Sequence, residues 1–165
     1  MLIMLYPKGD DDAGYLAFKV KAIASSQGLK VYIPPRMRRR EELPKEVRYN
    51  LKRAKKAILL VADPDAEMDR YTWAEMMFLL EENVPVKAVV PLDWTGLSLL
   101  HEIERLGVEI LRYEPYQPYS LWGLLNQEVK NSTEARLEGQ VAGAVIAIGL
   151  LLLLMWSLSE VSKKK

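Results

Sequence analysis

The stretch DRYTWAEMM, residues 69–77, holds a carboxylate around which an active site could be built, that of Glu75. The same residue also fits a purely structural interpretation. Thr72 and Glu75 have the Thr-x-x-Glu spacing of a capping box, in which the glutamate accepts a hydrogen bond from the backbone N–H of the threonine at a helix start. The local sequence favours this cap. An active-site role for Glu75 therefore depends on where the rest of the chain places it.

Two further groups of charged residues could take part in chemistry. Asp10 lies shortly after the first apolar run, and Asp63 directly follows a longer one. The basic run RMRRR begins at Arg36 and includes Arg38. Guanidinium groups bind phosphates and anionic lipid heads, but a basic run followed by acidic residues is more often a solvated loop. Both interpretations of the run stay open.

The composition excludes several classes of site. The chain has no cysteine, which excludes disulfides, thiolate nucleophiles and zinc–sulfur centres, and its only histidine, His101, cannot form a His-rich metal site. The formal net charge of +1 gives no global field that would attract nucleic acid. We therefore expect no metal, no required cofactor and no nucleic-acid partner. The abundance of Glu, Lys and Arg hints at a thermophilic source.

Short apolar runs alternate with helical patterns over the first 130 residues. We expect strands over residues 2–5, 29–33, 56–62, 86–92 and 108–113, and helices over residues 15–24, 47–54, 72–82, 96–107 and 119–130. Five such units predict an α/β domain with a flavodoxin-like, five-stranded parallel sheet and helices on both faces, because the crossovers are right-handed. Ligands of such sheets bind where the strands end, which here means residues 6–12, 34–40, 63–69, 93–95 and 113–116.

Residues 141–158, VAGAVIAIGLLLLLMWSL, carry no charge and predict a transmembrane helix. At about 1.5 Å per residue such a helix reaches ~27 Å, close to the ~30 Å hydrocarbon core of a bilayer. A buried core helix is the alternative, but it fits poorly with a segment that is apolar on every face and follows a complete domain. Residues 131–140 are then a linker and residues 159–165 a basic tail.

The N-terminal MLIMLYP lacks the basic region and the apolar length of a signal peptide. We therefore expect a single-pass protein of the cell membrane with its N-terminal domain in the cytoplasm, although the lysines beyond the span weakly favour the opposite orientation. Gly139, Gly143 and Ala147 form a row of small residues that allows two membrane helices to pack closely. This row and the loops of the α/β domain predict a homo-oligomer at the membrane.

The order of the motifs resembles the Toll/interleukin-1 receptor (TIR) domain family over roughly residues 2–92. Tyr6 and Asp10 match an aromatic residue at the end of the first strand and an acidic residue four positions later. The family's Gly-x-x-Val/Tyr pattern, which leads into the second strand, is matched by Gly28, Val31 and Tyr32.

The resemblance continues around Glu75. Tyr71 and Glu75 keep the family's spacing between an aromatic residue and a glutamate four positions later. Two positions depart from the pattern, because Lys45 follows Pro44 where the family has glycine, and Asp63 stands in place of a serine. Both departures fall in loops that are functional in the family.

In enzymatic members of the TIR family the corresponding glutamate cleaves NAD, so the resemblance implies NAD as a substrate and Glu75 as the catalytic residue. Nicotinamide already carries a positive charge and leaves without an acid, so this reaction needs no histidine, metal or thiol. The loop that begins at Arg36 matches the one that covers the nucleotide site and mediates assembly in the family. We expect the substrate to be bound by Tyr6, Asp10, Arg36, Arg38, Asp63 and Tyr71.

Three functions remain as alternatives. The first is a membrane-tethered cytoplasmic signalling and assembly module, and the second is an NAD glycohydrolase that uses Glu75. The third is a degenerate phosphoacceptor receiver domain, in which residues 10–12 would bind Mg²⁺ and Asp63 would be phosphorylated. A working receiver is not expected, because receivers place their acid pair directly at the end of the first strand, where this chain has Leu5 and Tyr6.

Overall fold

The computed structural model describes residues 1–26, 28–36, 42–95, 97–115 and 117–134. The chain divides into two compact units, Met1–Leu124 and Leu125–Lys165. Of the second unit, the described part is the end of the last helix, residues 125–134. The first unit contains all of the strands in the described residues, and with them the edge at which a parallel sheet binds ligands.

The first unit is built on a five-stranded sheet in the order β2-β1-β3-β4-β5, and every neighbouring pair of strands is parallel. The strands are β1 (Leu2–Leu5), β2 (Val31–Tyr32), β3 (Lys56–Leu60), β4 (Val86–Pro91) and β5 (Glu109–Tyr113). This confirms the predicted α/β class and the all-parallel sheet. The strand order is compatible with a flavodoxin-like arrangement.

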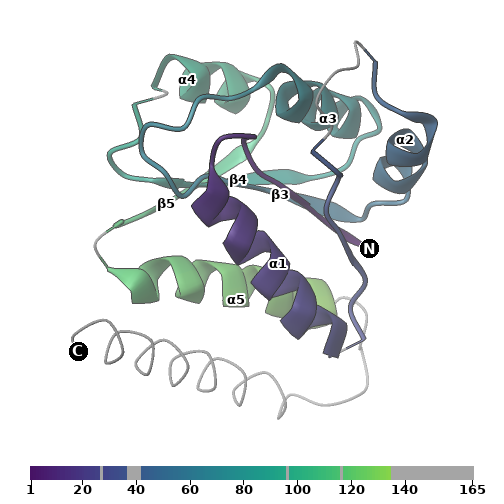
Figure 1. Cartoon of the computed structure of the whole chain (residues 1–165), viewed down its shortest axis with the longest axis horizontal. Coiled ribbons are helices and arrows are strands. Elements are labelled where there is room, and N and C mark those ends of the chain that lie inside the picture. Colours follow the sequence, from purple (N-terminus) through teal and green to yellow (C-terminus); the bar gives the residue numbers. More distant parts are fainter. Residues whose placement is uncertain (27, 37–41, 96, 116, 135–165) are drawn as a thin grey trace. The chain divides into compact units, whose positions relative to one another are not determined.

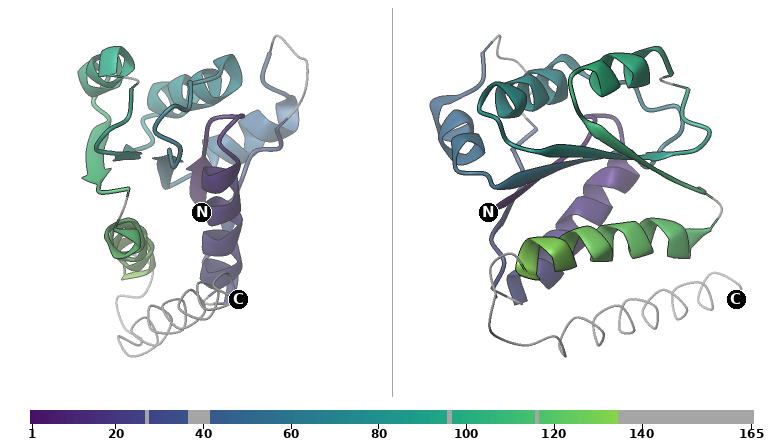
Figure 2. Two further views of the ribbon diagram at one scale, coloured as in Figure 1. Left: turned by 60° about the vertical axis from the view of Figure 1, so that its left-hand side comes forward. Right: turned by 180° about the vertical axis from the view of Figure 1, so that it is seen from behind.

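Helices connect the successive strands, as expected for parallel neighbours. They are α1 (Asp11–Ser26), α2 (Lys45–Lys52), α3 (Arg70–Glu81), α4 (Leu97–Arg105) and α5 (Pro118–Glu134), the last of which crosses the boundary between the two units. Within the first unit, α2, α3 and α4 cover one face of the sheet and α1 covers the other (Figures 1 and 2). The prediction of helices on both faces is therefore confirmed.

The central strands are buried on both faces, which explains why they read as continuous apolar runs. Alternate residues of β1 and β3, including Leu5 and Leu59, belong to a core cluster that also contains Leu51, Met76 and Ile103 from the three helices on that face. The intervening apolar residues of these strands are equally buried, namely Leu2, Met4, Ile58 and Leu60. The buried residues of α1 on the opposite face are mostly small, namely Ala13, Gly14, Ala17, Val20 and Ala24.

Four helices begin earlier than the sequence predicts: α2 at Lys45 and α5 at Pro118, by two residues and one, and α1 and α3 at positions that affect the site. Helix α1 begins at Asp11 rather than at residue 15, because the Asp10 carboxylate accepts a hydrogen bond from the Ala13 N–H at 2.8 Å and caps the helix. Helix α3 begins at Arg70 rather than at Thr72. The shift of α3 moves Glu75 away from the helix start and so changes its role.

The predicted membrane span at residues 141–158, the linker beyond residue 134, the basic tail and the row Gly139, Gly143 and Ala147 lie outside the described residues. Within the described ranges, no helix combines the length and the apolar character needed to cross a bilayer.

Candidate active site

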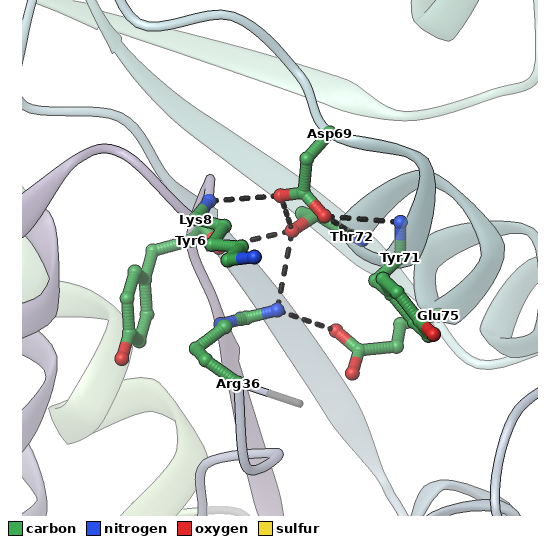
Figure 3. A network of polar contacts seen from close by, with 7 residues as sticks. All are labelled: Tyr6, Lys8, Arg36, Asp69, Tyr71, Thr72 and Glu75. Carbon is green, nitrogen blue, oxygen red and sulfur yellow. Dashed lines mark hydrogen bonds and ion pairs between the residues drawn. The ribbon is translucent and has the colours of Figure 1, made fainter. Parts of the chain in front are cut away.

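The candidate site lies where β1 and β3 end, the edge at which parallel sheets bind ligands. Three segments meet there: the loop after β1, the residues that follow β2, and the first turns of α3 (Figure 3). The side chains drawn together in Figure 3 are Tyr6, Lys8, Arg36, Asp69, Tyr71, Thr72 and Glu75.

Asp69 fixes the start of α3 against the loop after β1. Its carboxylate accepts hydrogen bonds from the N–H groups of Tyr71 (3.0 Å) and Thr72 (3.2 Å), which makes it the N-cap, and from the Lys8 N–H (2.8 Å). Burial alone would raise the pKa of Asp69, but the Thr72 hydroxyl and these N–H donors outweigh it and hold the pKa below its usual value. Asp69 is therefore ionised, and its hydrogen bonds connect two segments that are far apart in the sequence.

The capping-box interpretation of Glu75 is wrong. Because Asp69 is the N-cap, Thr72 is the third residue of the helix, and Glu75 lies one turn further on. The Thr72 hydroxyl lies 2.6 Å from an Asp69 oxygen and 3.0 Å from the Tyr6 carbonyl oxygen, so it donates its single proton to one of them. The sequence is ambiguous here because Thr72-x-x-Glu75 and Asp69-x-x-Thr72 are both acceptable helix starts.

Glu75 instead forms a buried ion pair with Arg36. Arg36 Nη1 donates to Glu75 Oε2 at 3.0 Å and to Thr72 Oγ1 at 3.2 Å. The side chains are 4% exposed for Glu75 and 14% exposed for Arg36. Glu75 Oε1 accepts no hydrogen bond from the part of the chain that the structure describes. Within the described residues, Arg36 therefore contacts only one of the two carboxylate oxygens.

Burial dominates the electrostatics of Glu75. Loss of hydration raises the pKa of Glu75 to about 7, although the charge of Arg36 and its hydrogen bond act in the opposite direction, and the charge of Asp69 raises the pKa further. A carboxyl group with a pKa near neutrality exchanges a proton under physiological conditions. Such groups gather at functional sites, although structural ion pairs also produce them.

Tyr6 completes the surroundings of Arg36. The guanidinium carbon lies 4.4 Å from the centroid of the Tyr6 ring, a cation–π contact. Gly14 of α1 makes room for this ring, because a Cβ atom at Gly14 would lie 3.0 Å from Tyr6 Cε2. Gly14, Asp69 and Thr72 are thus parts of the site that were not among the predicted site residues. The spacing of Asp69 and Thr72 is that of a helix N-cap and could have been recognised in the sequence. No pattern in the sequence links Gly14 to Tyr6.

The other predicted site residues do not all lie at the Arg36–Glu75 pair. Tyr71 precedes Glu75 by four residues, about one turn, in α3. Asp10 is 1% exposed, and besides capping α1 it accepts hydrogen bonds from the N–H groups of Ala62 (2.7 Å) and Asp63 (3.1 Å). Burial raises the pKa of Asp10 despite these donors. Through these hydrogen bonds Asp10 connects the end of β3 to the start of α1.

Asp63 is exposed, and its side chain accepts a hydrogen bond at 2.9 Å from the N–H of Asp65 in its own loop. No hydrogen bond within the described residues joins the Asp63 carboxylate to the Arg36–Glu75 pair. Arg38 lies outside the described residues.

A hollow lies against the first turns of α3. It is open, has a volume of ≈ 570 Å³ and is lined by Met68, Arg70, Trp73 and Trp94 among others. The indole N–H of Trp94 donates to the Ala66 carbonyl oxygen at 2.9 Å, so that ring is fixed in the wall. Neither Glu75 nor Arg36 lines this hollow.

The described residues contain no group of three or more His, Cys, Asp or Glu side chains arranged to hold a metal ion. No protein-family model matches the chain, and none of the curated proteins compared with it matches either.

Proposed function

We propose that this chain is a TIR-like, membrane-tethered cytoplasmic module whose Glu75 site cleaves NAD at the bond between nicotinamide and ribose. The observation that carries this proposal is the state of Glu75. It is a buried carboxyl group with a pKa of about 7 and one oxygen that no described donor reaches, at the ligand-binding edge of a parallel sheet. The order of the motifs around Tyr6, Tyr71 and Glu75 and the parallel sheet support the TIR-like assignment.

The reaction suits a site built on one carboxylate, because its leaving group needs no acid. When the C1′–N bond of the nicotinamide riboside breaks, its electron pair moves to the positively charged pyridinium nitrogen, and neutral nicotinamide leaves. The ribose becomes an oxocarbenium ion, and water adds at C1′ and loses a proton, which gives ADP-ribose. An anionic carboxylate beside C1′ stabilises the developing positive charge, most strongly where water is excluded.

Each neighbour of Glu75 has a part in this proposal. The ionised form of Glu75 faces the ribose through Oε1, the oxygen that Arg36 does not hold. Tyr71 lies one helical turn before Glu75 and offers an aromatic ring to the nicotinamide or the ribose. Arg36 lowers the pKa of Glu75 below the value that burial alone would give, which keeps a useful fraction of the carboxyl group ionised at neutral pH.

A second function, an assembly module without catalysis, is favoured by one specific observation. Arg36 pairs with Glu75 within the fold itself, and a buried pair of this kind also occurs as a purely structural element. In this alternative the domain self-associates at the membrane through its loops and through Gly139, Gly143 and Ala147.

Release of nicotinamide from NAD by the full chain in neutral detergent, with and without a crowding agent, separates the two functions. We expect Glu75→Gln to reduce the rate by at least about 100-fold, because the amide cannot stabilise a cation as a carboxylate does. Glu81→Gln is the matched control, since Glu81 is an exposed glutamate in the same helix. Absence of release from the wild-type chain under both conditions would leave the assembly module as the function.

A further inference from the structure

We infer that the edge of Arg36 formed by Nε and Nη2 is the receptor for a phosphate group, and that it holds the pyrophosphate of the dinucleotide next to Glu75. This inference deepens the proposed function and rests on it for the identity of the ligand. The phosphate-binding edge itself depends only on the contacts of Arg36.

The two edges of the Arg36 guanidinium differ in their hydrogen bonding. Nη1 donates to Glu75 Oε2 and Thr72 Oγ1. Nε and Nη2 are buried and find no hydrogen-bond acceptor within the described residues. Leaving buried donors of a charged group unpaired is unfavourable, and an acceptor that reached them would relieve the penalty. The fold therefore holds two parallel donors ready for a group that the described residues do not supply.

The geometry of this edge selects the ligand. The Nε–H and one Nη2–H of arginine point in the same direction and match two oxygens of a phosphate or a carboxylate. The plane of the guanidinium is fixed by the Tyr6 ring on one face and by the Nη1 bonds to α3. A ligand can occupy the Nε–Nη2 edge without breaking the pair with Glu75, because that pair uses Nη1.

The burial of Nε and Nη2 decides between two sources of phosphate. Each of these atoms has almost no contact with solvent, so a lipid headgroup held in a bilayer surface cannot reach them. A soluble phosphate ester is not tied to a bilayer surface, so it could reach the edge if the atoms that cover Nε and Nη2 move aside. We therefore assign the edge to a soluble phosphate ester.

The position of the edge agrees with cleavage at Glu75. In NAD the nicotinamide ribose is joined to its phosphate through a single CH₂ group. A phosphate on the Nε–Nη2 edge therefore places this ribose beside the carboxylate that the same guanidinium contacts through Nη1. Binding of the phosphate and placement of C1′ near Glu75 are then both due to one side chain.

Inorganic pyrophosphate is the direct probe, because it has no glycosidic bond to cleave. We expect calorimetric titration of the full chain in neutral detergent at about pH 7 to show binding that Arg36→Met weakens by roughly 10- to 100-fold. Arg36→Lys should lie in between, since an ammonium keeps the charge but not the two parallel donors. The matched control is Arg53→Met, because Arg53 also stacks on a tyrosine, Tyr49, but at an exposed site.

A second readout links pyrophosphate to Glu75. The charged and titratable groups that face Glu75 are Arg36, Asp69 and Tyr32. An added anion near Glu75 favours the protonated form of Glu75, so binding should take up more protons near pH 7 in the wild-type chain than in Glu75→Gln, where only the ionisation of pyrophosphate itself contributes. Repeating the titration in buffers of different ionisation enthalpy measures this uptake.

The outcomes separate this inference from the proposed function. Equal affinity of wild type and Arg36→Met for pyrophosphate, or no binding by wild type, overturns the phosphate-binding edge even if NAD is cleaved. Arg36-dependent binding without nicotinamide release supports the edge and contradicts the cleavage. If Arg36→Met does not fold, the double variant Arg36→Met/Glu75→Gln replaces it, because it removes both buried charges; loss of pyrophosphate binding relative to Glu75→Gln is then the expected result.

Discussion

At the scale of single residues, the chemistry of the site depends on the balance of forces on Glu75. Burial disfavours its charge, and the single hydrogen-bonded contact with Arg36 restores only part of the lost hydration, so the pKa settles at about 7. An exposed glutamate would be fully ionised at this pH, and a buried one without a cation would be neutral. A ligand near Glu75 can therefore change the charge of this side chain at neutral pH.

The rate of nicotinamide release should rise with pH through about 7 and level off above it, because the ionised form of Glu75 is the active one. Arg36→Met should move the midpoint to higher pH, since it removes the positive charge and the hydrogen bond that lower the pKa of Glu75. The measurement is kcat/KM for NAD against pH in both chains. A midpoint that stays in place would show that the titrating group is not the Arg36-paired carboxyl group.

Stability should respond to pH in the opposite sense. The pKa of Glu75 is about 7 in the folded chain and 4.5 as an ordinary value, so between these values the folded state binds a proton that the unfolded state has released. This stabilisation is complete below about pH 4.5 and is lost as pH rises through about 7, with a slope of at most about 1.4 kcal/mol per pH unit.

Denaturant unfolding of the wild type and of Glu75→Gln across this range measures the effect of Glu75 on stability. The difference in unfolding free energy between the two chains isolates Glu75, because Asp69 and the other carboxyl groups titrate in both. We expect the wild type to lose stability relative to Glu75→Gln as pH increases. A constant difference would contradict the raised pKa.

At the scale of elements, the site depends on how α1 and α3 meet the end of β1. Asp69 ties the first turn of α3 to the Lys8 N–H, and Thr72 lies within hydrogen-bond distance of the Tyr6 carbonyl oxygen. Gly14 in α1 leaves space for the Tyr6 ring. The guanidinium of Arg36 is thus oriented by two helices and a strand end, which makes its position sensitive to substitutions that never touch it.

Gly14→Ala tests this dependence. Alanine favours a helix over glycine by up to about 1 kcal/mol, but its Cβ would lie 3.0 Å from Tyr6 Cε2 and would push the ring. We expect a small change in melting temperature and a loss of pyrophosphate affinity and nicotinamide release. Gly123→Ala in α5 is the control, because a Cβ at Gly123 meets no atom within 4 Å. Unchanged binding in Gly14→Ala would show that the ring does not position Arg36.

The same elements show which structural features can be predicted from the sequence and which cannot. The strands are predictable because buried parallel strands are continuous apolar runs, as in residues 56–60. The start of α3 is not, because two overlapping capping patterns compete over Asp69, Thr72 and Glu75. The pairing of Arg36 with Glu75 is also beyond prediction, since 39 positions separate them and only the folding of the chain after β2 brings them together.

At the scale of the whole molecule, the expected membrane anchor would restrict the α/β domain to a surface. The uncharged run at residues 141–158 lies outside the described residues, and its role stays a prediction. Confinement to a membrane would raise the local concentration of the domain, which favours self-association without any new contact. Assembly and catalysis are therefore compatible in one chain.

The membrane prediction is tested on the intact protein. The full chain should remain in carbonate-washed membranes, whereas Leu150→Arg should weaken its retention, because an arginine near the centre of a membrane helix is unfavourable by about 2.5–3.5 kcal/mol. The control is Lys164→Arg, which changes the tail without changing its charge. Full recovery of the wild-type chain in the wash would contradict the span.

The measurement that tests the central claim most directly is the joint quantification of nicotinamide and ADP-ribose formed from NAD by the full chain, beside its Glu75→Gln variant. If Glu75 is the catalytic carboxylate, the wild type forms the two products in equal amounts, and the folded variant forms at least about 100-fold less of both. Equal product formation by the two chains would contradict the claim.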